Sequence, residues 1–280
     1  MTELTLDLTN PEGHAVEAMK AQTGLLDQFI LFGDSITQQA CSQERGFAFQ
    51  PALQNAFIRR LDVINRGFSG YNTSQCLAAL PSFMPKPSQA HVRFMMIFLG
   101  ANDAVLPHTS GQDVPLNLFC ANLKNIIQHP KVRAHATSVD RNMHAIKIIL
   151  VTPPPVDEYQ LEDSPNLNVR TAERTKSYAD SCRRVGEEMD VAVLDLWGIV
   201  MKKAGWKGKD GEVLVGSRKR ERSEVLGEML HDGLHFKPSA YEVLFEATME
   251  IVKDKWPSED PEEANFNYVL PRWETAPWAE

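Results

Sequence analysis

Residues 29–37 read Phe-Ile-Leu-Phe-Gly-Asp-Ser-Ile-Thr, a short apolar run that stops abruptly at small and polar residues. A run this short, apolar at every position, is typical of a strand buried on both faces of a parallel sheet. Further runs of this kind follow along the chain, at 63–65, 94–99, 146–151 and 191–194. Stretches with helical character lie between and after them, at 47–61, 74–83, 115–128, 170–189 and 239–255. Because strands alternate with helices, we predict an α/β fold: a three-layer α/β/α sandwich with about five parallel strands.

The composition is that of an ordinary globular protein with an acidic excess. The chain has 280 residues, with 29 basic and 37 acidic side chains, a net charge of −8 and an apolar fraction of 43%. Its length allows one large domain or two small ones at roughly 100–200 residues each, and its apolar fraction excludes wholesale disorder. The acidic balance argues against nucleic acid or an anionic membrane as the main partner, because phosphate binding requires clustered Lys and Arg.

The sequence predicts a reduced, cytoplasmic protein without a transmembrane segment. Its four cysteines are far apart and include no Cys-x-x-Cys pair, so they indicate neither a zinc site nor a disulfide framework. Residues 1–8 lack the basic start and the apolar run of a signal peptide. The longest clean apolar run, 94–99, is far shorter than the roughly 20 residues that span a bilayer.

We predict one domain over residues 1–255 and a separate tail over residues 256–280. Residues 205–222 are rich in Gly, Lys and Arg and interrupt the path from the last predicted strand to the last helix, which indicates an exposed basic insertion. The tail combines four prolines with three tryptophans, so it cannot form one long helix. The tryptophans indicate that the tail packs on the domain or meets a partner, and the sequence does not choose between the two.

The candidate nucleophile and base lie in two short motifs. Ser35 follows the first predicted strand, and the sites of open parallel sheets lie beyond the carboxyl ends of their strands. In Asp232-Gly233-Leu234-His235, the glycine permits a sharp turn that would fold Asp232 onto His235. A carboxylate bonded to Nδ1–H leaves Nε2 of the imidazole facing outward as a base. The structural alternatives are a helix cap at Ser35 or Thr37 and an Asx turn at Asp232 beside a surface histidine.

His231 and His235 suggest a competing metal site, because their i, i+4 spacing can bind a metal on one face of a helix. Gly233 and Pro238 indicate a loop instead, and no third ligand is evident in the sequence. The nucleotide-binding motifs Gly-x-x-x-x-Gly-Lys-Ser/Thr and Gly-x-Gly-x-x-Gly are also absent from it. We therefore predict neither a metal nor a cofactor.

Two more strand ends carry groups that can stabilise a negative charge. Gly70 follows the run at 63–65 and offers an unobstructed backbone N–H, while Asn102 follows the run at 94–99 and has an amide that can donate to an oxyanion. Each motif alone is consistent with an ordinary turn. Together with Ser35, however, they place a serine, a glycine and an asparagine after three successive strands, which favours an active site.

These motifs resemble the four sequence blocks of the SGNH, or GDSL-type, hydrolases, and they occur in the expected order. The matching residues are Gly33-Asp34-Ser35, Gly70 before Asn72, Gly100-x-Asn102-Asp103 and Asp232-x-x-His235. The resemblance covers residues 28–255 and is greatest to the isoamyl-acetate-hydrolysing esterase group, through Phe32, residues 71–73 and Phe236. The Gly-x-Ser-x-Gly elbow of the α/β-hydrolases and the Ser-x-x-Lys motif are both absent from the sequence.

The resemblance implies a flavodoxin-like fold and a role for each matching residue. Ser35 would be the nucleophile, His235 the general base and then the acid, and Asp232 the residue that orients His235. The implied oxyanion hole consists of the backbone N–H groups of Ser35 and Gly70 and the side chain of Asn102. The implied supports of the site loops are Asp34 and Asp103.

The resemblance also implies a serine esterase for short-chain, acetate-type esters, with a small ester and water as its partners. Candidates for a small apolar pocket are Phe68, Tyr71, Leu106 and Phe236. Alternative activities are those of a thioesterase, a lysophospholipase or a deacetylase of acetylated sugars. A rival from another class is a non-catalytic binding protein with the same fold, for which the Trp-rich tail is the best support. A dimer is compatible with the sequence, but no particular residue argues for it.

Overall fold

The computed structural model describes residues 26–136, 145–164, 167–262, 268–269 and 273–276, and within them five strands form one parallel sheet. The strands are β1 (Asp27–Gly33), β2 (Leu61–Gly67), β3 (Val92–Phe98), β4 (Lys147–Val151) and β5 (Ala192–Leu194). Their order, β2-β1-β3-β4-β5, is that of the flavodoxin-like sheets. The order reverses between β1 and β3, and this switch point is where such sheets bind ligands.

Side chains of β1 alternate between two hydrophobic cores, one on each face of the sheet. Phe29 and Leu31 pack into one core, whereas Ile30 and Phe32 pack into the other. All four are at most 1% exposed. This explains why the strand is apolar at every position, because neither face of the sheet is left to solvent.

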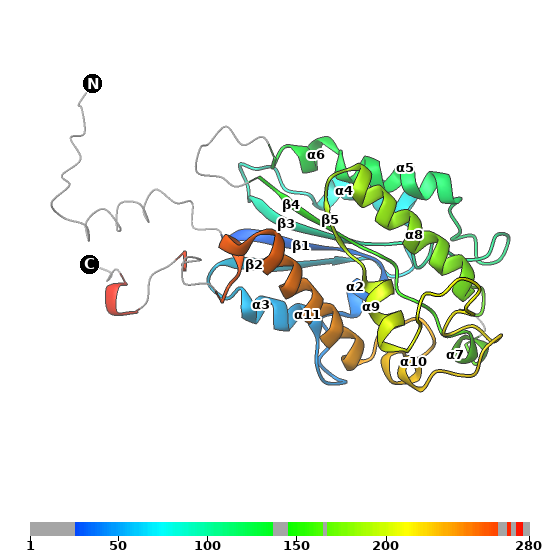
Figure 1. The fold of residues 1–280 in the computed structure, drawn as a ribbon. Coiled ribbons are helices and arrows are strands. Elements are labelled where there is room, and N and C mark those ends of the chain that lie inside the picture. The colour runs from blue at the N-terminus through cyan, green and yellow to red at the C-terminus, as the bar shows by residue number, and fades with distance from the viewer. Residues whose placement is uncertain (1–25, 137–144, 165–166, 263–267, 270–272, 277–280) are drawn as a thin grey trace, which may run out of the picture.

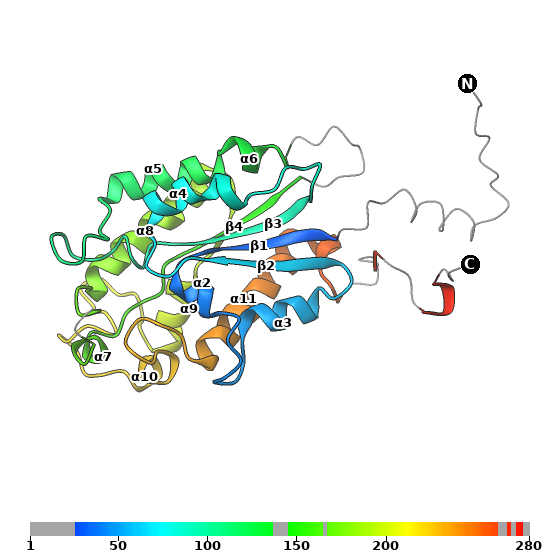
Figure 2. The ribbon, with the colours of Figure 1, turned by 180° about the vertical axis from the view of Figure 1, so that it is seen from behind.

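Helices cover both faces of the sheet, so the predicted three-layer α/β/α architecture is confirmed (Figure 1). One layer consists of α4 (Thr73–Phe83), α5 (Leu116–Ile127), α6 (Pro130–Arg133) and α8 (Ala172–Glu188). The opposite layer contains α2 (Ser35–Gln39), α3 (Phe49–Ala56), α9 (Leu196–Lys203), α10 (Glu224–Met229) and α11 (Pro238–Lys255), and the short helix α7 (Glu158–Glu162) adds Leu161 to the same core. The view from behind shows the same two layers on either side of the strands (Figure 2).

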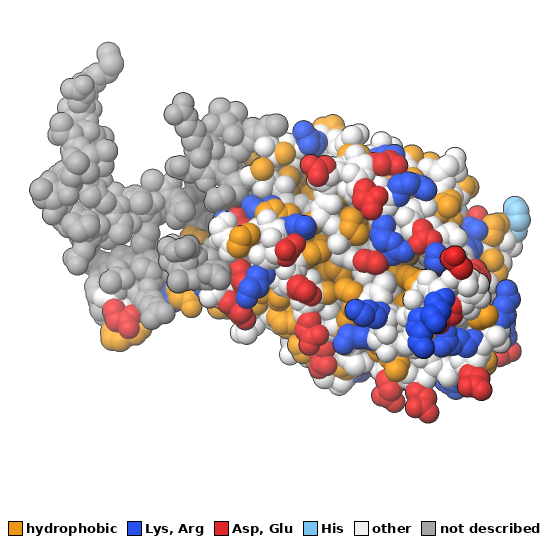
Figure 3. Space-filling view, in the orientation of Figure 1, with side chains coloured by type: hydrophobic (Ala, Val, Ile, Leu, Met, Phe, Trp, Pro, Cys, Tyr) orange, Lys and Arg blue, Asp and Glu red, His pale blue; other side chains and the backbone are white. Residues whose placement is uncertain are grey.

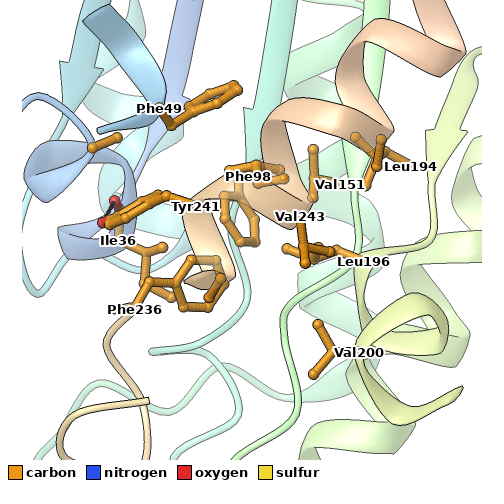
Figure 4. Packing of buried hydrophobic residues seen from close by; sticks show 14 of the residues in the cluster. Ile36, Phe49, Phe98, Val151, Leu194, Leu196, Val200, Phe236, Tyr241 and Val243 are labelled. Carbon is orange, nitrogen blue, oxygen red and sulfur yellow. Dashed lines mark hydrogen bonds between the residues drawn. The ribbon is translucent and has the colours of Figure 1, made fainter. Parts of the chain in front are cut away.

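The core of the opposite layer extends to the carboxyl ends of the strands, where the candidate residues lie. Figure 4 shows Phe98 of β3, Phe236 and Tyr241 among its members. The Tyr241 hydroxyl donates to the carbonyl of Ile36 at 2.7 Å, which ties α11 to the short helix α2. Helix α11, which follows the segment that carries His235, is therefore joined to the helix that begins with Ser35.

Two predictions from the sequence need correction. The helix expected at 47–61 ends at Ala56, because residues 57–60 form turns, with Arg59 at a positive φ of 61°, and Leu61 begins β2. The basic segment 205–222 is only partly exposed, because its residues 214–217 are buried. Gly216 packs directly against the backbone there, because a Cβ on it would lie 2.2 Å from the carbonyl oxygen of Val156.

The basic segment lies at the end of the molecule where the strands terminate. Figure 3 shows Lys and Arg side chains gathered at this end, with acidic side chains among them. Two of the basic groups have acidic partners: Arg218 pairs with Glu162 at 3.0 Å, and Arg220 pairs with Glu212 at 3.2 Å. These ion pairs belong to a solvated surface.

The described start of the tail packs against the domain. The Trp256 ring meets the Phe94 ring edge-on, with 5.5 Å between centroids. In η1 (Pro257–Glu259), the carboxylate of Glu259 is 2% exposed and pairs with Arg93 at 2.7 Å and Lys147 at 2.9 Å. In contrast, Trp273 of η2 (Trp273–Thr275) is 77% exposed. Trp278 and residues 1–8 lie outside the described residues.

Among the described residues, none of the helices has both the length and the apolar character needed to span a membrane.

Candidate active site

The candidate residues meet at the switch point of the sheet. Ser35 follows β1 as the first residue of α2, Gly70 lies in the loop after β2, and Asn102 lies in the turn after β3. Hydrogen bonds join the first two of these segments: Phe68 N–H donates to Gly33 at 2.9 Å, and Ser69 N–H donates to the side chain of Gln38 at 2.9 Å.

The two residues before Ser35 have structural roles, Gly33 in close backbone packing and Asp34 in capping a helix. A Cβ on Gly33 would lie 2.1 Å from Thr37 Oγ1 and 2.5 Å from the carbonyl oxygen of Phe98, so only glycine fits. Asp34 caps α2, with its side chain accepting from Ile36 N–H at 2.9 Å. The helix cap considered from the sequence therefore exists, but Asp34 provides it, and the hydroxyl of Ser35 has another partner.

That partner is His235. Ser35 Oγ lies 2.9 Å from His235 Nε2, and His235 Nδ1 lies 2.7 Å from Asp232 Oδ2. If Nδ1 carries the proton and donates a hydrogen bond to Asp232, Nε2 is left to accept from the Ser35 hydroxyl. Ser35 is 5% exposed, and the His235 side chain is 14% exposed. A hydroxyl, an imidazole and a carboxylate thus form one continuous chain, which is the arrangement that activates a serine nucleophile.

The turn that carries Asp232 fixes its own geometry. Asp232 Oδ1 accepts from the backbone N–H groups of Leu234 at 3.0 Å and His235 at 2.7 Å, which is an Asx-type turn. Gly233 has a φ of +86°, and a Cβ on it would lie 2.6 Å from the carbonyl oxygen of Asp157. The Asx turn that the sequence offered as an alternative is thus present, and it is what holds the two side chains together.

Electrostatics keep Asp232 ionised. Burial raises the pKa of Asp232, but hydrogen bonds from the side chain and backbone of His235 lower it by more than burial raises it. The pKa therefore lies below its ordinary range. A charged Asp232 can stabilise the imidazolium that forms when His235 accepts a proton.

His231 completes a group of three possible metal ligands with Asp232 and His235, whose ligand atoms all lie within 4.8 Å of one another. A metal here would compete with the 2.7 Å contact between Asp232 and His235. The segment is a loop rather than a helix, as the sequence predicts. The donor set is therefore better suited to orienting His235 than to holding an ion.

The Asn102 side chain is held beside the Gly70 loop. Its Nδ2 donates to the carbonyl of Tyr71 at 2.9 Å. Gln112 joins the two segments, because its Nε2 donates to Gly70 O at 2.8 Å and lies 3.4 Å from Asn102 Oδ1. Gly70 itself has a φ of +80°, in the left-handed region that glycine adopts at little cost. An amide nitrogen carries two hydrogens, so one Nδ2–H of Asn102 remains after the bond to Tyr71.

Asp103 links the same turn to helix α4. Its carboxylate accepts from the backbone N–H of Thr73 at 3.0 Å and from the Thr73 hydroxyl. Asp103 is fully buried, and burial raises its pKa to about 7 while the bonds from Thr73 lower it. Burial likewise raises the pKa of Asp34 to about 6, against the hydrogen bond from Ile36 and the charges of His235 and Arg170.

Two polar residues at the site are not evident from sequence spacing: Gln112 and Arg170. Arg170 is 4% exposed and donates from Nη2 to Asn102 Oδ1 at 3.0 Å and from Nε to the carbonyl of Ala101 at 3.0 Å. It lies 68 positions from Asn102, so no local motif connects the two. The sequence offers only one signal, an arginine at the start of the helix predicted at 170–189.

The four apolar pocket candidates lie in different surroundings. The rings of Phe68 and Tyr71 stack on each other, with 5.4 Å between centroids. Leu106 borders a hollow of about 630 Å³ that also contains Asp113 and Arg174. Phe236 borders a smaller hollow of about 190 Å³ beside His231.

Comparison with known proteins shows which family the chain is similar to. Residues 31–243 match the GDSL-like Lipase/Acylhydrolase family. A GDSL esterase/lipase of Arabidopsis thaliana is 31% identical over 252 residues, which cover 86% of this chain and 90% of that protein. The isoamyl acetate-hydrolyzing esterase 1 homolog of Homo sapiens is 30% identical over 255 residues, covering 89% of this chain and 88% of that protein.

Solved structures show the same fold. The lipase/acylhydrolase of Enterococcus faecalis superposes with a TM-score of 0.55 at 24% identity, covering 82% of this chain and 97% of its own. An acetyl-xylooligosaccharide esterase of Geobacillus gives a TM-score of 0.55 at 16% identity, covering 89% of this chain and 99% of its own. At these identities the likeness concerns the fold alone.

Proposed function

Because the chain belongs to the GDSL-like lipase/acylhydrolase family, and is therefore a serine hydrolase of the esterase type, we propose that it hydrolyses short-chain, acetate-type esters through an acyl-enzyme on Ser35. The observation that carries the proposal is the chain of contacts from Ser35 Oγ to His235 Nε2, at 2.9 Å, and from His235 Nδ1 to Asp232, at 2.7 Å. A serine hydroxyl is a weak nucleophile unless an adjacent base removes its proton.

In the first half of the reaction, His235 Nε2 takes the proton of Ser35 as Oγ bonds to the ester carbonyl carbon. Asp232 holds the imidazole in place and stabilises its positive charge. The tetrahedral intermediate then collapses, the bond to the alcohol oxygen breaks, and His235 donates its proton to the leaving alcohol. The acyl group stays on Ser35.

In the second half, water replaces the alcohol. His235 takes a proton from the water as its oxygen bonds to the acyl carbon. The bond to Ser35 Oγ breaks, the proton returns to Oγ, and the carboxylic acid leaves. Each group is thus restored, and the net reaction consumes one ester and one water.

The negative charge of both tetrahedral intermediates requires donors, and we assign three. The first is the backbone N–H of Ser35, which has no partner within its own helix because Ser35 is the first residue of α2. The second is the backbone N–H of Gly70. The third is the Nδ2–H of Asn102 that its bond to Tyr71 leaves over.

Acetate-type substrates are proposed because relatives with 30–32% identity over most of the chain are named as isoamyl acetate-hydrolyzing esterase homologs. The stacked rings of Phe68 and Tyr71 adjoin Gly70 in the chain and offer an apolar surface near the donors. One methylene in an apolar pocket changes binding by only about 1–3 kcal/mol, so we expect a graded chain-length preference.

Hydrolysis of p-nitrophenyl acetate, butyrate, octanoate and palmitate, measured with and without EDTA, tests the proposal. We expect the highest kcat/KM for acetate or butyrate, a progressive fall with chain length, and no effect of EDTA. A kcat/KM that rises with chain length, and rises further above the micelle concentration, would replace the esterase proposal with a lipase-like one.

A further inference from the structure

Arg170 is a buried positive charge placed directly behind the proposed oxyanion donor Asn102. It precedes helix α8, is 4% exposed, and reaches the turn after β3 with two nitrogens. Its Nη2 donates to Asn102 Oδ1 at 3.0 Å, and its Nε donates to the carbonyl of Ala101 at 3.0 Å. These contacts fix both the backbone and the side chain of the turn.

The chemistry of the partners allows only one orientation of the Asn102 amide. A guanidinium has donors and no acceptor, so the atom facing Arg170 must be Oδ1. Gln112 Nε2, at 3.4 Å, is a second donor on the same side. On the other side, Nδ2 meets an acceptor, the carbonyl of Tyr71. A flipped amide would face Arg170 with N–H groups and Tyr71 with an oxygen, so both contacts would be repulsive.

The charge of Arg170 adds a second effect. Burial lowers the pKa of Arg170 to about 10, against the charges of Asp34 and Asp232, so the guanidinium stays protonated at neutral pH. A positive charge on the oxygen side of an amide draws electron density toward that oxygen, and its N–H groups become stronger donors. The gain grows as the carbonyl oxygen of the substrate becomes negative, which occurs in the transition state.

We propose that Arg170 is a positioning residue that orients and polarises the Asn102 amide, so that its free Nδ2–H faces the developing oxyanion. The proposal rests on the proposed function, because it assigns Arg170 a part in the same ester hydrolysis. Arg170 touches no reacting atom, and its whole effect on turnover passes through Asn102.

Helix α8 offers a matched control in Arg174. Its Nε donates to the carbonyls of Ala104 and Val105 at 3.0 Å each, and its Nη2 donates to the Tyr178 hydroxyl at 3.0 Å. Arg174 thus contacts the same turn from within helix α8, four residues after Arg170, but at residues beyond Asn102. A general loss of turn stability would affect variants of both arginines.

The test is a double-mutant cycle with Arg170→Met and Asn102→Ala, measured as kcat and KM for p-nitrophenyl acetate. We expect Arg170→Met alone to lower kcat about 10- to 100-fold with KM within a few-fold, less than the roughly 100- to 1000-fold loss of a whole oxyanion donor. In the Asn102→Ala background the same change should lower kcat by less than about threefold, because its target is gone. Arg174→Met should lower Tm yet leave kcat within a few-fold of wild type.

An equal loss of kcat from Arg170→Met in both backgrounds, or an equal loss from Arg174→Met, would overturn the proposal. If Arg170→Met does not fold, Arg170→Lys replaces it in the cycle. Lysine keeps the charge but is a single point donor that cannot hold Ala101 and Asn102 together, so a smaller loss of kcat is expected. Ser35→Ala separates the two proposals. If Ser35→Ala is active, the proposed function is refuted. If Ser35→Ala is inactive but the Arg170 variants keep wild-type kcat, only the role of Arg170 is refuted.

Discussion

The loop that carries Asp232 and His235 holds its geometry within four residues, whereas the turn that carries Asn102 and Asp103 is held from distant parts of the chain. In the loop, Asp232 accepts from the backbone and the side chain of His235. In the turn, Asn102 depends on Tyr71 and Arg170, which are 31 and 68 positions away. The proposed base is therefore oriented by a local motif, and the proposed oxyanion donor by tertiary packing.

The pKa values of the carboxylates in the two regions are also shifted in opposite directions. Hydrogen bonds from His235 outweigh burial at Asp232, so its pKa lies below the ordinary range. At Asp103 burial outweighs the bonds from Thr73 and raises the pKa to about 7. The comparison implies that changes in the loop act mainly on catalysis, while changes around the turn act on both catalysis and stability.

Removing the proposed nucleophile should give the largest effect, and it tests the side of the comparison that contains His235 and Asp232. Ser35→Ala leaves His235 and Asp232 bonded to each other but without a hydroxyl to activate. We expect kcat to fall on the order of a million-fold, as in other serine hydrolases, with an unchanged Tm. The exposed change Ser88→Ala is the control and should keep full activity. Residual turnover in Ser35→Ala well above background would remove Ser35 from the mechanism.

Asp232→Asn should rank second. The amide no longer holds His235 in the tautomer that leaves Nε2 as an acceptor, so we expect a loss of about 10⁴-fold in kcat near neutral pH. Stopped assays of p-nitrophenol release measure this loss, and Asp254→Asn, at a highly exposed position, serves as the control. A loss of only a few-fold would show that the turn backbone alone orients His235.

Asn102→Ala should rank third and probe the turn side. One oxyanion donor is typically worth about 100- to 1000-fold in kcat, and KM should change little because the donor acts mainly in the transition state. Asn117→Ala on the exposed face of α5 is the matched control. An Asn102→Ala enzyme within a few-fold of wild type would remove Asn102 from the oxyanion hole.

The smallest expected effect concerns stability: Asp103 and Asp232 should change the unfolding free energy with pH in opposite directions. An unfolded Asp titrates near pH 4, so a folded pKa of about 7 at Asp103 means that the folded protein binds more protons between these values. Its stabilising contribution is full below about pH 4 and is lost as the pH rises through about 7. Asp34, with a pKa of about 6, acts in the same direction. Asp232 has the opposite sign, because its contribution is present above about pH 4 and lost below it.

Asp103→Asn should therefore flatten the fall in unfolding free energy between pH 4 and 7, by an amount on the order of a kcal/mol or more. Urea unfolding at several pH values measures this slope for wild type and variant. The same slope in both proteins would mean that Asp103 is ionised throughout this range.

Much of the fold was predictable because the buried strands are apolar at every position, as in residues 29–32. The end of α3 was not, because the apolar pattern continues through Phe57 and Leu61 while the backbone turns at Arg59. The partial burial of residues 205–222 was missed because the basic residues around them suggested solvent on all sides. Local composition does not show which residues of a loop pack against the rest of the protein.

The candidate site divides in the same way. Ser35, Asp232 and His235 could be found from their motifs, because a turn and a strand end specify where each side chain stands. Arg170 and Gln112 could not. The contact of Arg170 with Asn102 arises only when the segment before helix α8 packs against the turn after β3, and the contact of Gln112 arises only when the loop after β3 folds back on itself. Residues that position a catalytic group through tertiary contacts leave no spacing in the sequence.

The most direct test of the central claim is the mass of the intact protein after reaction with diethyl p-nitrophenyl phosphate. An activated Ser35 attacks phosphorus, p-nitrophenolate leaves, and the diethylphosphoryl group remains on Oγ. We predict one such group per chain on wild type, mapped to Ser35 by peptide sequencing, and none on Ser35→Ala. An unmodified wild-type protein that still hydrolyses p-nitrophenyl acetate, or a label at another residue, would contradict the account.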